Sequence, residues 1–307
     1  MRKWRGALIG TAALVLIAAA CGSSNDDSAP AKATTTSAPV RAVTTCANRG
    51  SAPKRYDSVV VFSFENRTWD AVGQGFGPKM PYLHDLGMKC AWFPEWTEAD
   101  TKQVSLSQYM GQITGAPEPK VINDCNPSAT CHTTANSIFR QARLKGLDAV
   151  NYVEGATQPC SAEGNAPKHV PALYLYGDSD PAHCTEQVRP YTDFDPTALP
   201  DFALVTPTLC NYGHDCGNDI VDSWARANIQ PVLDSADYKA GKVAVFVWYD
   251  EDMPVPNLWI TPTATSGSHP LAGAGYSATL AAWQSMLGLG CLESSCGAAD
   301  MRTAANS

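Results

Sequence analysis

Short apolar runs alternate along this chain with amphipathic segments, and the alternation predicts an α/β fold. Two runs, 58–64 and 242–249, consist mainly of β-branched and aromatic residues, which is typical of strands buried on both faces. The same reasoning identifies the further strands and the helices. Strands are expected at 149–153, 202–207 and 258–261, and helices around 80–87, from 104–109 toward Gly115, and at 137–144, 219–235 and 276–287. This order predicts a mostly parallel central sheet flanked by helices on both faces.

Polar residues follow the two most apolar strands at the point where each strand ends. Glu65 and Asn66 follow the first strand, and Asp250 and Glu251 follow the strand at 242–249. Ligands of open α/β sheets bind beyond the carboxyl ends of the strands, and carboxylate and amide oxygens suit hard divalent cations. The sequence therefore predicts that these four residues hold one divalent metal ion. Either group alone would equally fit a solvated surface turn.

The first 20 residues read as an export signal. Arg2, Lys3 and Arg5 precede an apolar stretch that is too short for a permanent membrane span. Small residues then lead into Cys21, which resembles a bacterial lipobox, in which the cysteine is acylated. We expect a signal peptide at 1–20 and a lipid anchor on Cys21 at the outer face of the bacterial cell membrane, with simple secretion as the alternative.

Composition separates a tether from a folded domain. Residues 21–52 are mostly Ser, Thr, Ala and Pro, so we expect a flexible tether, with the folded domain at 53–300. The formal net charge is −8, and it becomes −11 when the three basic residues of the signal peptide are removed. An acidic chain without a basic cluster argues against nucleic acid as a partner.

The cysteine count agrees with export. Ten cysteines remain after Cys21, and an even number in an exported chain predicts disulfides. The spacing favours three local pairs and two longer ones, although sequence alone does not fix the connectivity. The expected pairs are Cys125/Cys131, Cys210/Cys216, Cys291/Cys296, Cys46/Cys90 and Cys160/Cys184. A zinc hydrolase is the weakest reading, because there is no Cys-x-x-Cys pair and no two histidines share a helix at ligand spacing.

Several blocks of the chain resemble a known family. The stretch 64–70, Phe-Glu-Asn-Arg-Thr-Trp-Asp, is similar to the opening "E-N-R-S-F-D" motif of the phosphoesterase family that contains bacterial phospholipases C and acid phosphatases, within the alkaline-phosphatase-like superfamily. Further blocks follow in the family's order over about residues 56–290. They lie at 105–109 with 114–115, 146–154, 168–172, 199–207 with 214–215, and 248–251. The resemblance implies an alkaline-phosphatase-like fold and hydrolysis of phosphate mono- or diesters.

The resemblance also implies roles for individual residues. Ser105 would be the nucleophile, and Glu65, Asn66, Asp250 and Glu251 would ligate the metal. His169 and His214 would contact the phosphoryl group or protonate the leaving oxygen, and Asp215 would orient His214 or line the pocket. A divalent cation beside a serine hydroxyl is a coherent arrangement for forming a phosphoseryl intermediate. The expected substrate is a small phosphate ester or a phospholipid headgroup.

The chain departs from the family pattern at three places. Ser107-Gln108 replaces the family's Pro-Asn, and Tyr212 stands where the family has an aspartate. Gly275 and its neighbours replace a block that carries a histidine, and His269 is the nearest available substitute. These departures favour an alternative from a different class, namely a non-catalytic surface lipoprotein that keeps the fold and binds a ligand or partner.

Overall fold

The computed structural model describes most of the chain after residue 50. The described residues are 46, 51–68, 79–93, 96–100, 104–121, 123–175, 181–265, 267, 274–299 and 301–305. Several expectations fall outside these ranges and stay predictions. They concern the signal peptide, Cys21, most of the tether, the end of the 64–70 motif and His269.

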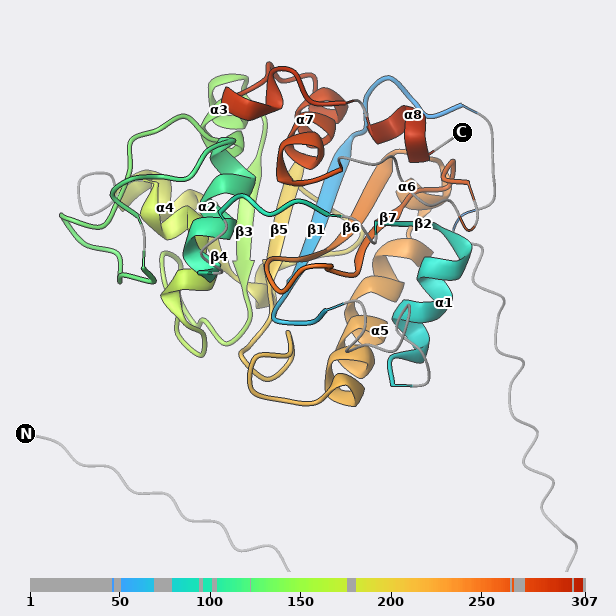
Figure 1. The fold of residues 1–307 in the computed structure, drawn as a ribbon, viewed down its shortest axis with the longest axis horizontal. Helices are drawn as coiled ribbons and strands as arrows, with labels where there is room; N and C mark the ends of the chain where they lie inside the picture. The colour runs from blue at the N-terminus through green and yellow to red at the C-terminus, as the bar shows by residue number, and fades with distance from the viewer. Residues whose placement is uncertain are drawn as a thin grey trace, which may run out of the picture. The chain divides into compact units, whose positions relative to one another are not determined.

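Among the described residues, seven strands form one sheet, and the predicted mostly parallel arrangement is confirmed (Figure 1). Strand β7 runs in the opposite direction to the other six, so its pairings with β2 and β6 are antiparallel. The strand order is β2 (Ala91–Phe93), β7 (Asn257–Ile260), β6 (Val243–Tyr249), β1 (Ser58–Phe64), β5 (Phe202–Thr206), β3 (Ala149–Val153) and β4 (Val188–Pro190). The five predicted strands are all present. The two edge strands, β2 and β4, were not predicted.

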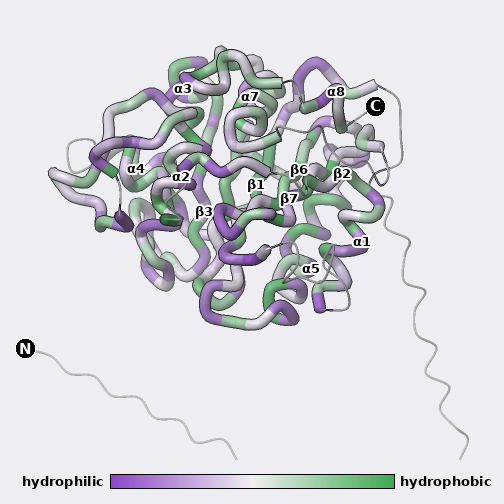
Figure 2. The backbone as a smooth tube through the Cα atoms, in the orientation of Figure 1, coloured by the Kyte–Doolittle hydropathy of each residue, from purple (hydrophilic) through white to green (hydrophobic). Residues whose placement is uncertain are grey.

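Strand β1 lies in the middle of the sheet and orients the functional end of the fold. It pairs in parallel with β6 on one side and β5 on the other, and every residue of β1 and β6 is buried. In Figure 2 these central strands are coloured mainly as hydrophobic residues. Phe62 and Phe64 point to one face, where both contact the Trp224 ring. Because successive side chains of a strand point to opposite faces, the side chain of Glu65, the residue after Phe64, is directed to the other face.

Helices cover both faces of the sheet, as predicted (Figure 1). Helices α2, α3 and α7 pack together on one face, and α1 packs with α5 on the other. The helices are α1 (Pro81–Lys89), α2 (Ser105–Thr114), α3 (Ile138–Leu144), α4 (Pro181–Gln187), α5 (Asn218–Asp234), α6 (Ala236–Lys239), α7 (Tyr276–Leu287) and α8 (Met301–Ala305). The short helices α4, α6 and α8 were not predicted. No helix in the described part of the chain is long and apolar enough to cross a membrane.

Local sequence explains where the site-bearing helix begins and ends. The backbone at Val104 is extended, and α2 starts at the next residue, Ser105. The helix ends at Gly115, whose φ of 85° lies in the left-handed region that glycine adopts without a steric cost. A side chain there would also meet the Leu292 carbonyl oxygen at 2.5 Å. The glycine therefore permits both the helix end and the close approach of the C-terminal segment.

Five disulfides form in the structure, and all five expected pairs are confirmed. They are Cys46–Cys90, Cys125–Cys131, Cys160–Cys184, Cys210–Cys216 and Cys291–Cys296. The Cys46–Cys90 bond links a residue of the predicted tether to the end of α1.

Candidate active site

The adjacent strands β1 and β6 deliver three carboxylates to one place, as the sequence predicted. Glu65 follows β1, and Asp250 and Glu251 follow β6. One carboxylate oxygen from each residue lies within 4.8 Å of the others, and the three side chains are buried. The parallel register between the strands, with Phe64 opposite Tyr249, brings the two strand ends level. The predicted convergence of Glu65, Asp250 and Glu251 is therefore a property of the fold.

This carboxylate cluster is electrostatically unfavourable without a cation. Two unit charges 4.8 Å apart repel by about 3 kcal/mol at an effective dielectric constant of 20. Burial, together with the neighbouring Glu65 carboxylate, raises the pKa of Glu251 to about 7. Burial and the same carboxylate raise the pKa of Asp250 well above its ordinary value. Both Asp250 oxygens, Glu65 Oε1 and Glu251 Oε2 lack hydrogen-bond partners in the described structure. A divalent cation among these oxygens would compensate for both costs.

Asn66 supplies a fourth group at the same point. Its φ of 46° lies in the left-handed region, which asparagine tolerates better than most residues. The end of its amide that faces the cluster lies 3.0 Å from Glu251 Oε1 and 3.2 Å from Glu65 Oε2. With the carboxylates alone, the amide nitrogen would take this place and donate to both. With a cation in the cluster, the amide oxygen would take it. The donor set of hard oxygens thus fits a divalent ion such as Mg²⁺, Mn²⁺ or Ca²⁺.

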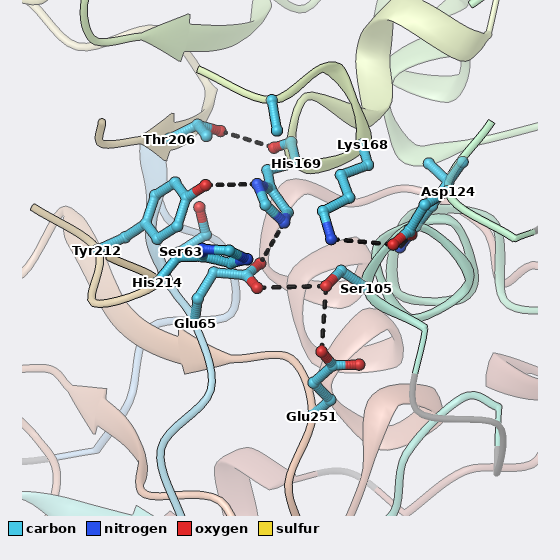
Figure 3. A network of polar contacts seen from close by, with 12 residues as sticks. Ser63, Glu65, Ser105, Asp124, Lys168, His169, Thr206, Tyr212, His214 and Glu251 are labelled. Carbon is cyan, nitrogen blue, oxygen red and sulfur yellow. Dashed lines mark hydrogen bonds and ion pairs between the residues drawn. The ribbon is translucent and has the colours of Figure 1, made fainter. Parts of the chain in front are cut away.

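Ser105 lies between two of the carboxylates, at the first residue of α2 (Figure 3). Its Oγ is 3.2 Å from Glu65 Oε2 and 3.1 Å from Glu251 Oε1. A hydroxyl has one proton, so it donates to only one of these oxygens at a time. The second close oxygen is readily explained if Oγ and the carboxylates share a cation. The structure thus places the predicted nucleophile against the predicted metal ligands.

His169 lies behind Glu65 and is completely buried. Its Nε2 is 3.3 Å from Glu65 Oε1, although the angles are not those of a hydrogen bond. Its Nδ1 makes a close hydrogen bond with the Tyr212 hydroxyl. Tyr212, noted in the sequence only as a departure from the family pattern, therefore contacts a predicted site residue directly.

His214 and Asp215 lie on the loop that follows β5. Asp215 Oδ1 is 2.7 Å from His214 Nδ1, a contact that fits the first of the two roles the resemblance implied for Asp215, namely orienting His214 or lining the pocket. The His214 side chain is 35% exposed and its ring centre lies 5.8 Å from that of His169. In Figure 3 it lies alongside Glu65. His214 is therefore a histidine at the site that solvent, and hence a substrate, can reach.

A disulfide and hydrogen bonds from Arg67 and Glu65 hold this loop against the end of β1. The Cys210–Cys216 disulfide closes it, and Arg67, two residues beyond Glu65, donates hydrogen bonds to the Cys216 carbonyl oxygen and to Asn218 Oδ1. The Glu65 backbone N–H also donates to the Tyr212 carbonyl oxygen at 3.0 Å. The loop is thus fixed in register with the metal-ligand candidates.

Lys168 and Asp124 are site residues that the sequence analysis did not assign. Lys168 Nζ lies 2.9 Å from Asp124 Oδ2, and the other Asp124 oxygen accepts a hydrogen bond from the Leu106 N–H at the start of α2. Burial opposes the charge of Lys168, but the hydrogen bond and charge of Asp124 raise its pKa overall. In Figure 3 the ammonium group lies on the Ser105 side of the cluster. The only sequence signal was the position of Lys168 beside His169 in a family block.

The remaining departures from the family pattern have structural roles. Gln108 Oε1 accepts hydrogen bonds from the Ala99 and Asp100 N–H groups, so this side chain fastens the preceding loop to α2. Gly275 packs against Thr97, where a side chain would meet the Thr97 carbonyl oxygen at 2.7 Å.

Solved structures share this architecture at low sequence identity. A protein of the alkaline phosphatase superfamily from Vibrio parahaemolyticus aligns with a TM-score of 0.56 and 12% identity, over 84% of this chain and 72% of that one. The lipoteichoic acid synthase LtaP from Listeria monocytogenes aligns with a TM-score of 0.55 and 9% identity, over 82% and 77%. The protein Ps i-CgsB, in complex with k-i-k-neocarrahexaose, aligns with a TM-score of 0.53 and 10% identity, over 81% and 76%. No protein-family model and no curated protein matches the chain.

Proposed function

From this alkaline-phosphatase-like fold, we propose that the protein is a metal-dependent hydrolase of phosphate or sulfate esters, with phosphate mono- or diesters as the preferred class. The observation that carries the proposal is Ser105 Oγ between Glu65 Oε2 and Glu251 Oε1, at the end of two strands that deliver buried carboxylates. A nucleophile candidate and a set of metal ligands within one hydrogen-bond distance are the two parts that this chemistry needs.

The metal ion would be held by Glu65, Asn66, Asp250 and Glu251. When bound, it would offset the carboxylate charge and stabilise negative charge on the ester. Metal loading and substrate binding would therefore both depend on this cluster.

The protein's own groups suffice for the proton transfers. Ser105 Oγ attacks phosphorus while its proton passes to the carboxylate that accepts its hydrogen bond. The bond from phosphorus to the leaving oxygen breaks, and His214, oriented by Asp215, protonates that oxygen. Water then attacks the phosphoseryl ester and gives a proton to His214, which restores the acid form of this histidine. The carboxylate returns its proton to the departing Ser105 oxygen, and phosphate or a phosphate monoester is released. Lys168 would hold an anionic oxygen of the ester during both steps.

We propose further that the protein works outside the cell, anchored through Cys21 or secreted. Five disulfides support an oxidising compartment, because such bonds rarely persist in the cytosol. The substrate would then be an extracellular phosphate ester or a lipid headgroup at the membrane surface.

The proposal is tested by hydrolysis of aryl phosphate monoesters, aryl phosphate diesters and aryl sulfates, with added divalent metals or with chelator. Ser105→Ala should abolish hydrolysis. Ser107→Ala, which changes an equally buried serine on the same helix, should not. The preferred ester sets the substrate class. A protein that binds metal but cleaves none of these esters would favour the non-catalytic alternative, a surface lipoprotein that binds a ligand or partner.

A further inference from the structure

His169 is enclosed in a way that a proton donor to a leaving group would not be. Its exposed fraction is 0%, and each ring nitrogen faces a protein group: Nδ1 the Tyr212 hydroxyl and Nε2 the Glu65 carboxylate. The rings of Tyr109 and Tyr212 lie against the imidazole, with ring centres 5.7 and 5.0 Å away. Neither ring nitrogen therefore faces the solvent from which a substrate would arrive.

Electrostatics decides which nitrogen carries the proton. The Tyr212 hydroxyl lies in hydrogen-bond contact with His169 Nδ1, and a phenol, which is ordinarily neutral near pH 7, can donate its proton there. If Tyr212 donates to Nδ1, the imidazole proton is on Nε2, the nitrogen that lies 3.3 Å from Glu65 Oε1. The angles of this contact are not those of a hydrogen bond, so the attraction is that of a ring N–H for a nearby carboxylate charge. The opposite tautomer would place the Nε2 lone pair against a carboxylate oxygen, which is repulsive in a buried site.

Glu65 divides its two oxygens between different partners. Oε1 faces His169, while Oε2 lies 3.2 Å from Ser105 Oγ. Tyr212 contributes twice, because its carbonyl oxygen also accepts the Glu65 N–H. His169 is itself fixed at the backbone, where its carbonyl oxygen accepts a hydrogen bond from Thr206 Oγ1. The rotation of the Glu65 carboxylate is thus set by a chain of contacts from Tyr212 through His169.

We infer that His169 is a positioning residue whose Nε2–H faces the metal-ligand candidate Glu65, and that Tyr212 holds it in this tautomer. The inference deepens the proposed function and changes one role in it, since protonation of the leaving oxygen falls to His214 alone. A hydrogen-bonding partner behind a ligating side chain fixes the orientation of that side chain, and its loss typically lowers metal affinity 10- to 100-fold. Tyr212, in place of the family's aspartate, supplies this support without adding a fourth negative charge to the cluster.

Nitrogen NMR of ¹⁵N-histidine-labelled, metal-free protein tests the tautomer. The His169 signals, assigned by their absence in His169→Gln, should show a protonated Nε2 and an unprotonated Nδ1. Tyr212→Phe should reduce the population of this tautomer. A wild-type His169 protonated on Nδ1 alone would overturn the inference.

Calorimetric titration with Mn²⁺ or Mg²⁺ tests the positioning role. Tyr212→Phe should weaken metal binding by about tenfold. The matched control is Tyr191→Phe, which removes a hydroxyl that donates to Asn228 away from the cluster and should change nothing. His169→Gln keeps an N–H that can reach Glu65 and should retain more affinity than His169→Leu. Equal affinities in the Tyr212 and Tyr191 variants, with both folded by circular dichroism, would contradict the inference.

These measurements use no substrate, so they separate the two claims. Correct tautomer and affinity data in a protein that hydrolyses nothing would leave the positioning role in place and remove the proposed function. Hydrolysis by wild type, combined with unchanged metal binding in His169→Leu, would support the proposed function and remove the positioning role of His169.

Discussion

At the scale of single residues, the defining feature of the site is the burial of its three carboxylates. Asp250 is 2% exposed and both its oxygens lack partners among the described residues, an arrangement that is expensive unless a cation is bound. The sequence could predict Glu65 and Asp250 because both follow long apolar strands. It could not predict Lys168 or Tyr212 as partners of the site, since their contacts arise from segments that are distant in the chain.

The raised pKa of Glu251 predicts a pH dependence of metal-free stability. This pKa is about 7 in the folded protein and near 4.5 for an unperturbed glutamate, so between these values the folded state binds more protons than the unfolded state. Stability conferred by the neutral carboxyl is therefore complete below about pH 4.5 and is lost as the pH rises through about 7. The melting temperature of chelator-treated protein should fall over this range.

Variants at two glutamates check that assignment. Glu251→Gln should flatten the pH dependence because its amide does not ionise, while Glu293→Gln, at an exposed position, should leave the dependence unchanged. Saturating metal should raise the melting temperature more at high pH than at low pH, because binding requires the ionised carboxylate. A melting temperature that rises with pH in the metal-free protein would contradict this account.

Lys168 should contribute to substrate binding through its charge. Lys168→Met should lower kcat/KM for anionic esters by about tenfold or more, which corresponds to about 1.4 kcal/mol, and should weaken inhibition by inorganic phosphate. Metal affinity should rise in the same variant, because a positive charge beside Glu65 and Glu251 is removed. Lys89→Met removes a lysine from a surface pair with Asp85 and is the matched control. Unchanged phosphate inhibition in Lys168→Met would exclude this role.

At the scale of elements, the site is built from loops fastened to rigid strand ends. The strands that deliver the carboxylates were predictable, because seven-residue apolar runs such as β1 and β6 admit few other structures. The edge strands β2 and β4 were not, because three residues carry no periodicity and their pairing is decided by tertiary contacts. Helix α2 was expected only in outline, yet its first residue, Ser105, is central to the site.

The Cys210–Cys216 disulfide should matter for activity beyond its effect on stability. Replacing both cysteines with serine should cost about 2 kcal/mol in the chain-entropy model, and the same change at Cys291 and Cys296 should cost nearly as much, because the two loops are almost equally long. Only the first pair holds the loop with Tyr212 and His214. Hydrolysis should therefore fall about tenfold more in the first variant. Equal losses of activity at equal loss of stability would show that this disulfide has no role in the site.

At the scale of the whole molecule, one disulfide ties a residue of the predicted tether to the fold. The expected Cys46–Cys90 bond attaches a residue of the Ser-, Thr-, Ala- and Pro-rich segment to the fold, although the composition of that segment predicts a tether. The composition of a segment indicates whether that segment can form a hydrophobic core of its own. It does not indicate whether a disulfide attaches the segment to the rest of the fold. The predicted boundary at residue 53 therefore omits a residue that is bonded to the fold.

Two truncations test this boundary. Protein that starts at residue 43 should match the melting temperature of protein that starts at residue 22. Protein that starts at residue 53 lacks Cys46 and should be less stable by about 2–4 kcal/mol, given the 44-residue separation of the bonded cysteines. Adding Cys90→Ser to the short form removes the unpaired thiol as a separate cause. Equal melting temperatures for all three proteins would show that the bond contributes nothing.

The most direct test of the central claim is to trap the intermediate on Ser105. Metal-loaded protein is mixed with an aryl phosphate ester that has a good leaving group, quenched in acid, digested and analysed by mass spectrometry. We predict a burst of the aryl alcohol and a phosphoryl group on the peptide that contains Ser105, with neither in Ser105→Ala. Hydrolysis by Ser105→Ala at the wild-type rate would contradict the claim and show that Ser105 is not the nucleophile.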